Sequence, residues 1–311
     1  MERKAKYVAL LLAAVTLLVP FVAPWLKTPL ILGTAFGIAA LGISILIVSA
    51  QISFGHALYV CVGGYACAFA LRQWAQLDSA LLLVLGAAVG ALAGAIIGSF
   101  VVRYRGIFFG MLNLALSMVL YAALGKFFNI SGGTDGLRLD RSPFFGMDLG
   151  RDAFETTLLF CGVLLALLLG WGVQRYLKSP AGQALAALKT NETRLEYVGI
   201  SAWRTLWVGY VISATLCGLS GAIFAIAQGL VTPEMGYWVR SGEIVFVAIL
   251  GGVAHPVGAF IGAAIFEFVK LFAAAYLTGA WQMVLGFVLI AMVFLAPRGV
   301  SALLESKRRD A

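Results

Sequence analysis

The segment from Leu177 to Arg204, LKSPAGQALAALKTNETRLEYVGISAWR, is the one long charge-bearing stretch between runs that are otherwise almost wholly apolar. Its local pattern predicts two short helices. Ser179 is suited to cap the first, because Pro180 follows at the first helical position. Asn191 is suited to cap the second, and Gly199 is typical of the residue that ends such a helix. This segment is either an ordinary pair of helices at a membrane surface or a contact for another protein.

The composition of the whole chain indicates an integral membrane protein. Of 311 residues, 62% are hydrophobic and 12% are charged, and the mean hydropathy is +0.98. A water-soluble fold could not cover so many apolar side chains with polar surface. The net charge of +8 would suggest nucleic-acid binding in a soluble protein, but most basic residues lie at the ends of apolar runs, where they set the orientation in the membrane. We therefore expect membrane lipid, and no nucleic acid, around this chain.

Ten apolar runs can be separated at polar or turn-forming positions, and each is a candidate membrane segment, since a helical span needs about 20 apolar residues. The stretch 242–272 is too long for a single span, because one helix of that length would measure roughly 46 Å. The dipeptide His255-Pro256 favours a break there, with two short or partly inserted segments. The ten runs are approximately 7–23, 30–50, 55–73, 80–101, 106–123, 154–174, 205–228, 242–254, 257–273 and 276–296.

The distribution of positive charge supports this count. With the N-terminus inside, ten segments place most of the 22 basic residues on the cytoplasmic side, whereas nine would leave the basic C-terminus outside, against the positive-inside rule. We therefore predict a single all-α transmembrane domain over residues 1–311 with both termini cytoplasmic. Its cytoplasmic loop is about 177–204, and its external loop is about 124–153. The basic residues assigned to the cytoplasm are Arg3, Lys4, Lys6, Arg103, Arg105, those of the 175–204 region, Arg298, Lys307, Arg308 and Arg309.

Polar side chains and glycines that interrupt the apolar runs are candidates for a substrate path, because such groups usually face a cavity or another helix. The alternative for the segment 51–56 is a cytoplasmic turn that Gly55 bends and in which His56 is hydrogen-bonded within the bundle. The alternative for Asn113 is a hydrogen bond that joins two helices. The position of Glu243, one residue inside an apolar run, indicates an interfacial charge rather than an intramembrane acid. The candidate path residues are Gln51, Ser53, Gly55, His56, Asn113, Glu243, Gly251 and Gly252.

The remaining side chains offer little for other chemistry. His56 has no second metal-ligating residue at a suitable spacing, so no metal site is expected. The four cysteines lie inside apolar runs and are expected to be packing residues. The glycine-rich SGGTDG at 131–136 lacks the order of a phosphate-binding loop, so we expect a structured connecting loop. Glu267 and Lys270 are three residues apart and are expected to neutralise each other.

Six separated motifs, taken in order, resemble the LivM-like family of permeases from ATP-binding cassette (ABC) importers for branched-chain amino acids. The resemblance extends from the segment 51–56 to the end of the last apolar run. The matching stretches are SFGHALYVCVGGYACA from Ser53, the region around Arg105, Gly106 and Phe109, SGGTDG from Ser131, SPAGQALAALKTNETRLEYVGI from Ser179, LGGVAHPVGAFIGA from Leu250 and APRG from Ala296.

The resemblance implies a fold, partners and roles. The implied fold is a bundle of mostly tilted helices that pairs with a second, homologous permease subunit, and the implied location is the bacterial inner membrane. Two ABC ATPase subunits and an external solute-binding protein would complete the importer. ATP and Mg would be used by the ATPases, since this chain has no Walker A motif and is expected to be neither an enzyme nor a cofactor-binding protein. The residues implied to contact an ATPase are Ser179, Pro180, Gly182, Asn191, Glu192, Gly199 and Ile200.

Three alternatives stay open. Urea or short amides could be the substrate in place of an amino acid. An ion-coupled secondary transporter would favour buried charged groups near mid-membrane, of which the sequence has few. A membrane enzyme would need converging Asp, His or Cys residues. For an importer of amino acids, we expect the breaks at 51–56 and 251–256 to approach each other near the path, because free helix ends suit the two charges of the substrate.

Overall fold

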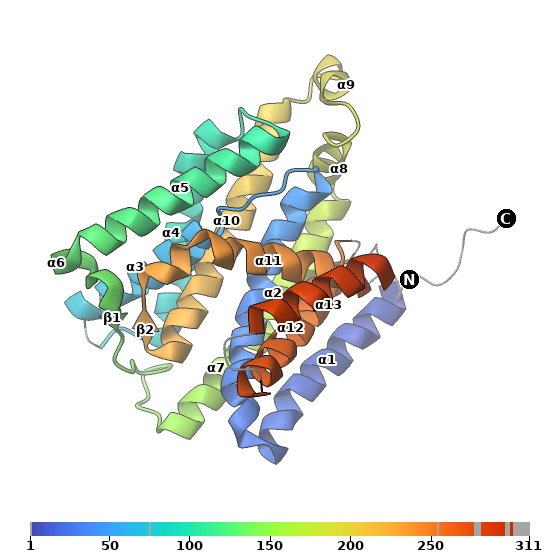
Figure 1. Ribbon diagram of the computed structural model, residues 1–311. Helices are drawn as coiled ribbons and strands as arrows, with labels where there is room; N and C mark the ends of the chain where they lie inside the picture. Colours follow the sequence, from blue (N-terminus) through green and yellow to red (C-terminus); the bar gives the residue numbers. More distant parts are fainter. Residues whose placement is uncertain (1, 75, 254, 277–280, 296–298, 301–311) are drawn as a thin grey trace.

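Helices form almost the whole of the protein. The computed structural model describes residues 2–74, 76–253, 255–276, 281–295 and 299–300, and Figure 1 shows their arrangement as a bundle of long helices. The elements in chain order are α1 (Glu2–Val22), η1 (Pro24–Leu26), α2 (Lys27–Val48), α3 (Ala57–Gln73), α4 (Ser79–Val101), α5 (Gly106–Lys126), α6 (Phe128–Ser131), η2 (Gly133–Asp135), β1 (Leu137–Arg138), α7 (Arg151–Lys178), α8 (Pro180–Ala187), α9 (Glu192–Tyr197), α10 (Ala202–Gln228), β2 (Leu230–Val231), η3 (Pro233–Gly236), α11 (Trp238–Gly251), α12 (Pro256–Tyr276) and α13 (Trp281–Leu295).

Each of the ten predicted apolar runs coincides with a helix. Among the described residues, six helices are long and apolar enough to cross a membrane: α2 with η1, α4, α5, α7, α10 and α12. The other four are α1, whose apolar part is shorter, and α3, α11 and α13, which have 17, 14 and 15 residues. The all-helical membrane class is therefore confirmed. Ten membrane crossings with cytoplasmic termini stay a prediction, and Arg298 and the basic C-terminal residues lie outside the described part.

The long apolar region 242–273 is divided into two helices, as the dipeptide His255-Pro256 indicates. α11 ends at Gly251, and α12 begins at Pro256. Gly252 follows α11 with a φ of +83°, a conformation that glycine adopts without steric strain. α11 is short, as expected. α12 is not, because it continues to Tyr276 and reaches 21 residues, enough for a full crossing.

α10 lies at the centre of the bundle and is packed through small residues. One face of α4 carries a glycine every fourth residue, and a Cβ on Gly90 would lie 2.9 Å from the Cα of Gly218 in α10. A Cβ on Gly63 of α3 would lie 2.2 Å from the carbonyl oxygen of the same Gly218. Side chains would separate these backbones, so the glycines allow the close approach that stabilises helix pairs in lipid. The α4 stripe was not among the motifs singled out from the sequence, and it consists of Gly86, Gly90, Gly94 and Gly98.

Two polar segments lie at opposite ends of the bundle (Figure 1). At one end are α8 and α9. At the other end β1 pairs with β2 in an antiparallel arrangement, with Leu137 opposite Val231. The SGGTDG motif forms the end of α6, η2 and the turn before β1, so it is a structured connection, as predicted. The short strand pair forms across the long separation between 137 and 231, which no local pattern reveals.

Three cysteines are buried within the helices. Cys61, Cys67 and Cys217 are free thiols in the apolar core, and Cys161 is partly exposed. Cys217 packs where α10 crosses α2, with its sulfur 3.8 Å from the carbonyl oxygen of Ala39. These positions are those of small packing residues.

Candidate functional site

The segment between α7 and α10 folds as its capping residues predict. The Ser179 hydroxyl accepts a hydrogen bond from the Gly182 amide at 3.4 Å, with Pro180 at the first position of α8. The Asn191 side chain accepts from the Arg194 amide at 3.0 Å and so caps α9. Both caps satisfy amide groups that a helix start would otherwise leave unpaired. The predicted helical pair is therefore confirmed.

Two glycines shape this pair for different reasons. A Cβ on Gly182 would lie 2.2 Å from the carbonyl oxygen of Tyr176, so only glycine lets α8 fold back against the end of α7. Gly199 has a φ of +83°, and its amide donates to the carbonyl of Glu196 at 2.9 Å. The Ile200 amide donates to Leu195 at 3.0 Å, which closes α9 in the manner of a glycine C-terminal cap.

The end of α9 presents apolar side chains to its surroundings. Tyr197 is 88% exposed and Val198 is 73% exposed, and Ile200 is also exposed. No residue of α9 is buried. Exposed apolar side chains at this position suit either a membrane surface or a contact with another protein, so both interpretations of this loop stay open.

A bidentate ion pair ties α9 to the corner between α4 and α5. Arg105 donates from Nη2 to Glu192 Oε1 at 2.7 Å and from Nε to Oε2 at 2.9 Å. The guanidinium also donates to the backbone carbonyls of Val102 and Tyr104. Two parallel bonds between a guanidinium and a carboxylate fix geometry as well as contributing energy. Glu192, predicted as a contact of another protein, thus has its carboxylate bound within this chain.

The same corner contacts the break between α2 and α3. The amide of Gly106, the residue after Arg105, donates to the Gln51 side chain at 2.9 Å. Gln51 is buried. A continuous path therefore leads from α9 through the α4–α5 corner to the segment 51–56. Its four residues, Glu192, Arg105, Gly106 and Gln51, were all named from the sequence.

The segment 51–56 is packed against α5 and α11. The Ser53 hydroxyl and His56 Nδ1 are 2.6 Å apart, and both residues are fully buried. A Cβ on Gly55 would lie 2.0 Å from the carbonyl oxygen of Asn113 in α5. The Ala57 amide, at the start of α3, donates to the Ser241 hydroxyl of α11 at 2.9 Å. Close packing, with His56 hydrogen-bonded inside the bundle, is the arrangement that the structure shows here.

Two tyrosines that no sequence motif singled out join this segment to α10. The Tyr59 hydroxyl donates to the Tyr210 hydroxyl, and Tyr210 donates to the side-chain Oδ1 of Asn113, with oxygen–oxygen distances of 2.8 and 2.5 Å. The His56 ring packs edge-on against both tyrosines, with ring centroids 5.2 Å apart in each case. Asn113 therefore joins helices, as the more conservative of its two interpretations expects. Tyrosine hydroxyls inside apolar runs were the signal that could have found this cluster.

Glu243 is buried inside the bundle, and its assignment as an interfacial charge stays a prediction. Its side chain is 11% exposed and accepts a hydrogen bond from Arg240 at 3.0 Å. The Arg240 guanidinium in turn lies over the rings of Phe36 and Phe224, at 5.1 and 5.2 Å from their centroids. Aromatic faces from α2 and α10 therefore enclose the ion pair, which a position beside an apolar run could not reveal.

The second break joins α11 to α12 by close backbone contact. A Cβ on Gly251 would lie 1.9 Å from the carbonyl oxygen of Gly258, and one on Gly262 would lie 2.3 Å from that of Val247. Glycines at these positions let the two backbones approach closely, and the role of Gly251 in a substrate path stays a prediction. The contacts of this break lead to α12, to Gly299 and, through His255 and Gln174, to α7. Those of the segment 51–56 lead to α5, α10 and the first turn of α11. The expected approach of the two breaks to each other stays a prediction.

These features define a multi-pass helical membrane protein with a structured helical loop at one end. Residues 26–293 match the family described as "Branched-chain amino acid transport system / permease component". The chain belongs to this family, and the LivM-like resemblance is confirmed.

Three permease proteins of known transport systems are similar to most of this chain. It is 27% identical to the high-affinity branched-chain amino acid transport system permease protein LivM of Salmonella typhimurium, over 73% of this chain and 58% of that protein. It is 25% identical to a probable branched-chain amino acid transport permease protein LivH of Methanocaldococcus jannaschii, over 84% and 87%. The autoinducer 2 import system permease protein LsrC of Enterobacter is 26% identical, over 86% and 78%. No solved structure matches the chain.

Proposed function

We propose that this chain is the transmembrane permease subunit of an ABC importer for branched-chain or related amino acids in the bacterial inner membrane. Its partners are a second homologous permease subunit, two ABC ATPase subunits and an external solute-binding protein. The family match over residues 26–293 and the similarity to the LivM and LivH permeases support the permease role and the substrate class. ATP and Mg are used by the ATPase subunits.

The observation that carries the mechanism is the path from α9 into the bundle. The α8–α9 pair projects from one end, carries exposed apolar side chains at Tyr197 and Val198, and is tied to the core through Arg105 and Glu192. An ATPase that contacts this pair moves the α4–α5 corner with it, and the Gly106–Gln51 bond carries the movement to the segment 51–56. Two discrete packings of these elements are the physical basis of alternating access.

The substrate path follows from the same elements. Gln51, Ser53 and His56 are buried by α5, α10 and α11 in this structure. Contact with substrate therefore requires the packing of the segment 51–56 against Asn113 and Tyr210 to open during the cycle. Glu243, Gly251 and Gly252 lie along α11 and line the same path only in a state that separates α11 from its neighbours.

The test is uptake of labelled leucine by proteoliposomes that contain this chain, its second permease and ATPases, with the binding protein outside. We expect uptake that requires ATP and stops when the ATPase subunits lose hydrolysis. Uptake that continues with inactive ATPases and collapses with a protonophore would instead assign an ion-coupled transporter, for which the buried carboxylates of Glu243 and Glu267 are the favouring observation.

Competition in the same assay separates the substrate classes. Excess valine or isoleucine is expected to abolish leucine uptake, whereas excess urea or acetamide is expected to leave it unchanged. The likeness to LsrC makes a non-amino-acid solute the second candidate. Competition by urea, acetamide or a small sugar-like solute, with none by valine, would assign that class and overturn the amino-acid proposal.

A further inference from the structure

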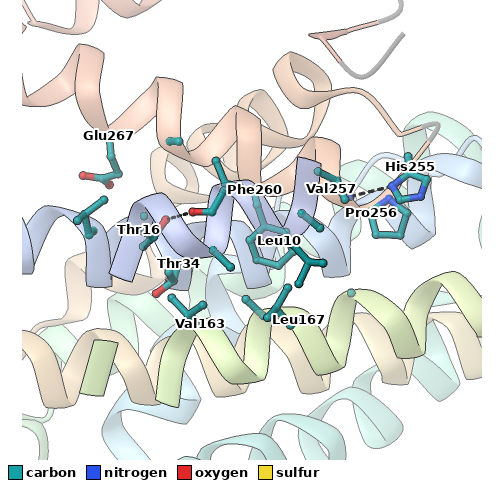
Figure 2. Close-up of a pocket in the computed structure, with 18 of the residues that line it drawn as sticks. Leu10, Thr16, Thr34, Val163, Leu167, His255, Pro256, Val257, Phe260 and Glu267 are labelled. Atoms are coloured by element: carbon teal, nitrogen blue, oxygen red, sulfur yellow. Dashed lines mark hydrogen bonds between the residues drawn. The ribbon is translucent and has the colours of Figure 1, made fainter. Parts of the chain in front are cut away.

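A cavity of about 350 Å³ lies between α1, α2, α7 and α12, apart from the elements proposed to carry transport (Figure 2). Its volume is within the range of small-molecule sites. Apolar side chains form most of the wall, and polar groups are gathered at its two ends. Figure 2 shows Glu267 at one end and His255 at the other, with Leu10, Leu167 and Phe260 between them.

The cavity is long. Glu267 follows Pro256 by 11 residues of α12, and both residues line the wall, which corresponds to roughly 16 Å along the helix axis. Apolar side chains line most of that length. The cavity therefore suits an extended hydrocarbon chain that runs along α12.

One end of the cavity carries a buried acceptor that the protein leaves unpaired. Glu267 is 8% exposed, and its Oε1 accepts no hydrogen bond within the described part of the chain. The carboxylate lines the cavity beside Thr16 and Thr34, as Figure 2 shows. The Thr16 hydroxyl already donates to the Leu12 carbonyl at 2.8 Å, and the Thr34 hydroxyl donates to the Ile31 carbonyl at 2.7 Å. A ligand that carries a hydrogen-bond donor would satisfy Glu267, and an unpaired buried acceptor is costly.

The surrounding charges decide what kind of donor fits. Lys270 and Arg240 act on Glu267 with positive charge, and Glu243 acts with negative charge. With both carboxylates ionised, these four side chains sum to zero net charge. An ammonium group bound at Glu267 would add an uncompensated positive charge to the interior, which is strongly unfavourable, whereas a hydroxyl donates a hydrogen bond and leaves the sum unchanged.

We propose that this cavity binds a neutral single-chain lipid whose hydroxyl donates to Glu267 and whose hydrocarbon chain extends along α7 and α12 toward His255. A long-chain alcohol, a monoglyceride and a protonated fatty acid share this chemistry. The site is independent of the proposed transport function, because it requires neither ATP nor a partner subunit.

Photolabelling tests the head-group chemistry on the unaltered protein. A long-chain alcohol that carries a diazirine in its chain is added to the purified chain in lipid nanodiscs, and the labelled peptides are mapped by mass spectrometry. We expect label on the cavity-lining parts of α2, α7 and α12. Dodecanol is expected to compete at least tenfold better than dodecane or dodecyltrimethylammonium. Equal competition by all three, or label spread evenly over the outer faces of α4 and α5, would overturn the proposal.

A matched pair of glycines on α7 tests the location. A Cβ on Gly170 points toward the Phe260 ring at 3.7 Å, so Gly170→Leu fills the cavity, whereas a Cβ on Gly172 meets no atom within 4 Å. We expect Gly170→Leu to reduce labelling at least tenfold and Gly172→Leu to leave it at the level of the unaltered chain. Glu267→Leu is expected to lose labelling as well. Normal labelling of the Gly170→Leu protein would refute the site, even if the Glu267 variant fails to fold.

Two further experiments identify the source and the chemical class of the natural ligand. Lipids extracted from the purified protein are compared by mass spectrometry with those of the surrounding membrane, and enrichment of a monoglyceride or a fatty alcohol identifies a membrane source. A fatty acid is tested by its competition at low and at neutral pH, because only the protonated form carries the donor. The assignment of a neutral lipid would be refuted if the extracts match the bulk membrane and if a long-chain alcohol, a monoglyceride and a fatty acid all fail to compete.

Discussion

The ion pair between Arg105 and Glu192 makes a quantitative prediction about transmission through the loop. Arg105→Glu and Glu192→Arg each place like charges at a bidentate contact of 2.7 and 2.9 Å. The two side chains are 28% and 38% exposed, so screening by water limits the pair to about 1 kcal/mol. That energy is about fivefold in an equilibrium constant. The doubly exchanged protein restores opposite charges and is expected to recover most of the loss.

The assay is ATP hydrolysis by the reconstituted importer, stimulated by the substrate-loaded binding protein. We expect each single exchange to lower the stimulated rate about fivefold and to leave assembly intact, as checked by size-exclusion chromatography. Glu196, exposed on the same helix, supplies the control: a Glu196→Arg exchange combined with Arg105→Glu is expected to give no recovery. The reasoning is refuted if the double exchange at positions 105 and 192 is as impaired as either single one, or if neither single exchange has an effect.

Three further predictions concern single sites. Gly199→Val is expected to strain the left-handed end of α9 by about 1–2 kcal/mol and to weaken stimulated ATP hydrolysis. Asparagine tolerates that conformation, so Gly199→Asn is expected to retain the stimulated rate. Equal rates of ATP hydrolysis in the two variants would contradict a role of this backbone conformation in coupling. Gly55→Ala is expected to lower the thermal unfolding temperature, because its Cβ would lie 2.0 Å from a backbone oxygen of α5, whereas Gly125→Ala, with open space around it, is expected to be neutral. In a cysteine-free background, Asp140→Cys is expected to react with a membrane-impermeant maleimide from outside and Thr193→Cys only from the cytoplasm; the reverse pattern at either site would refute the orientation.

The caps of α8 and α9 could be predicted because each depends on residues within one turn of one another. Ser179 and Asn191 accept from amides three positions further along, and Gly199 takes the backbone conformation that ends a helix. The break before Pro256 and the ten helical runs are equally local, since hydropathy and turn-forming residues specify them without reference to the rest of the chain.

The interior contacts of the candidate site could not be predicted, because they join residues that are far apart in the sequence. Arg105 and Glu192 are 87 positions apart, and Tyr59 and Tyr210 are 151 apart. The sequence around each of these residues does not indicate its partner. The position of Glu243 beside the start of an apolar run does not indicate that Phe36 and Phe224, from two other helices, enclose its ion pair with Arg240.

The sequence by itself determined the membrane class, the helices, their caps and the segment that projects from the bundle, because hydropathy and capping act over a few residues. The tertiary structure alone decided which polar groups meet. In a bundle embedded in lipid, a helix face is apolar whether it contacts lipid or another helix, so composition says little about which helices pair. Close contacts such as that of Gly90 with Gly218, and the cavity that ends at Glu267, exist only where separate helices are brought together.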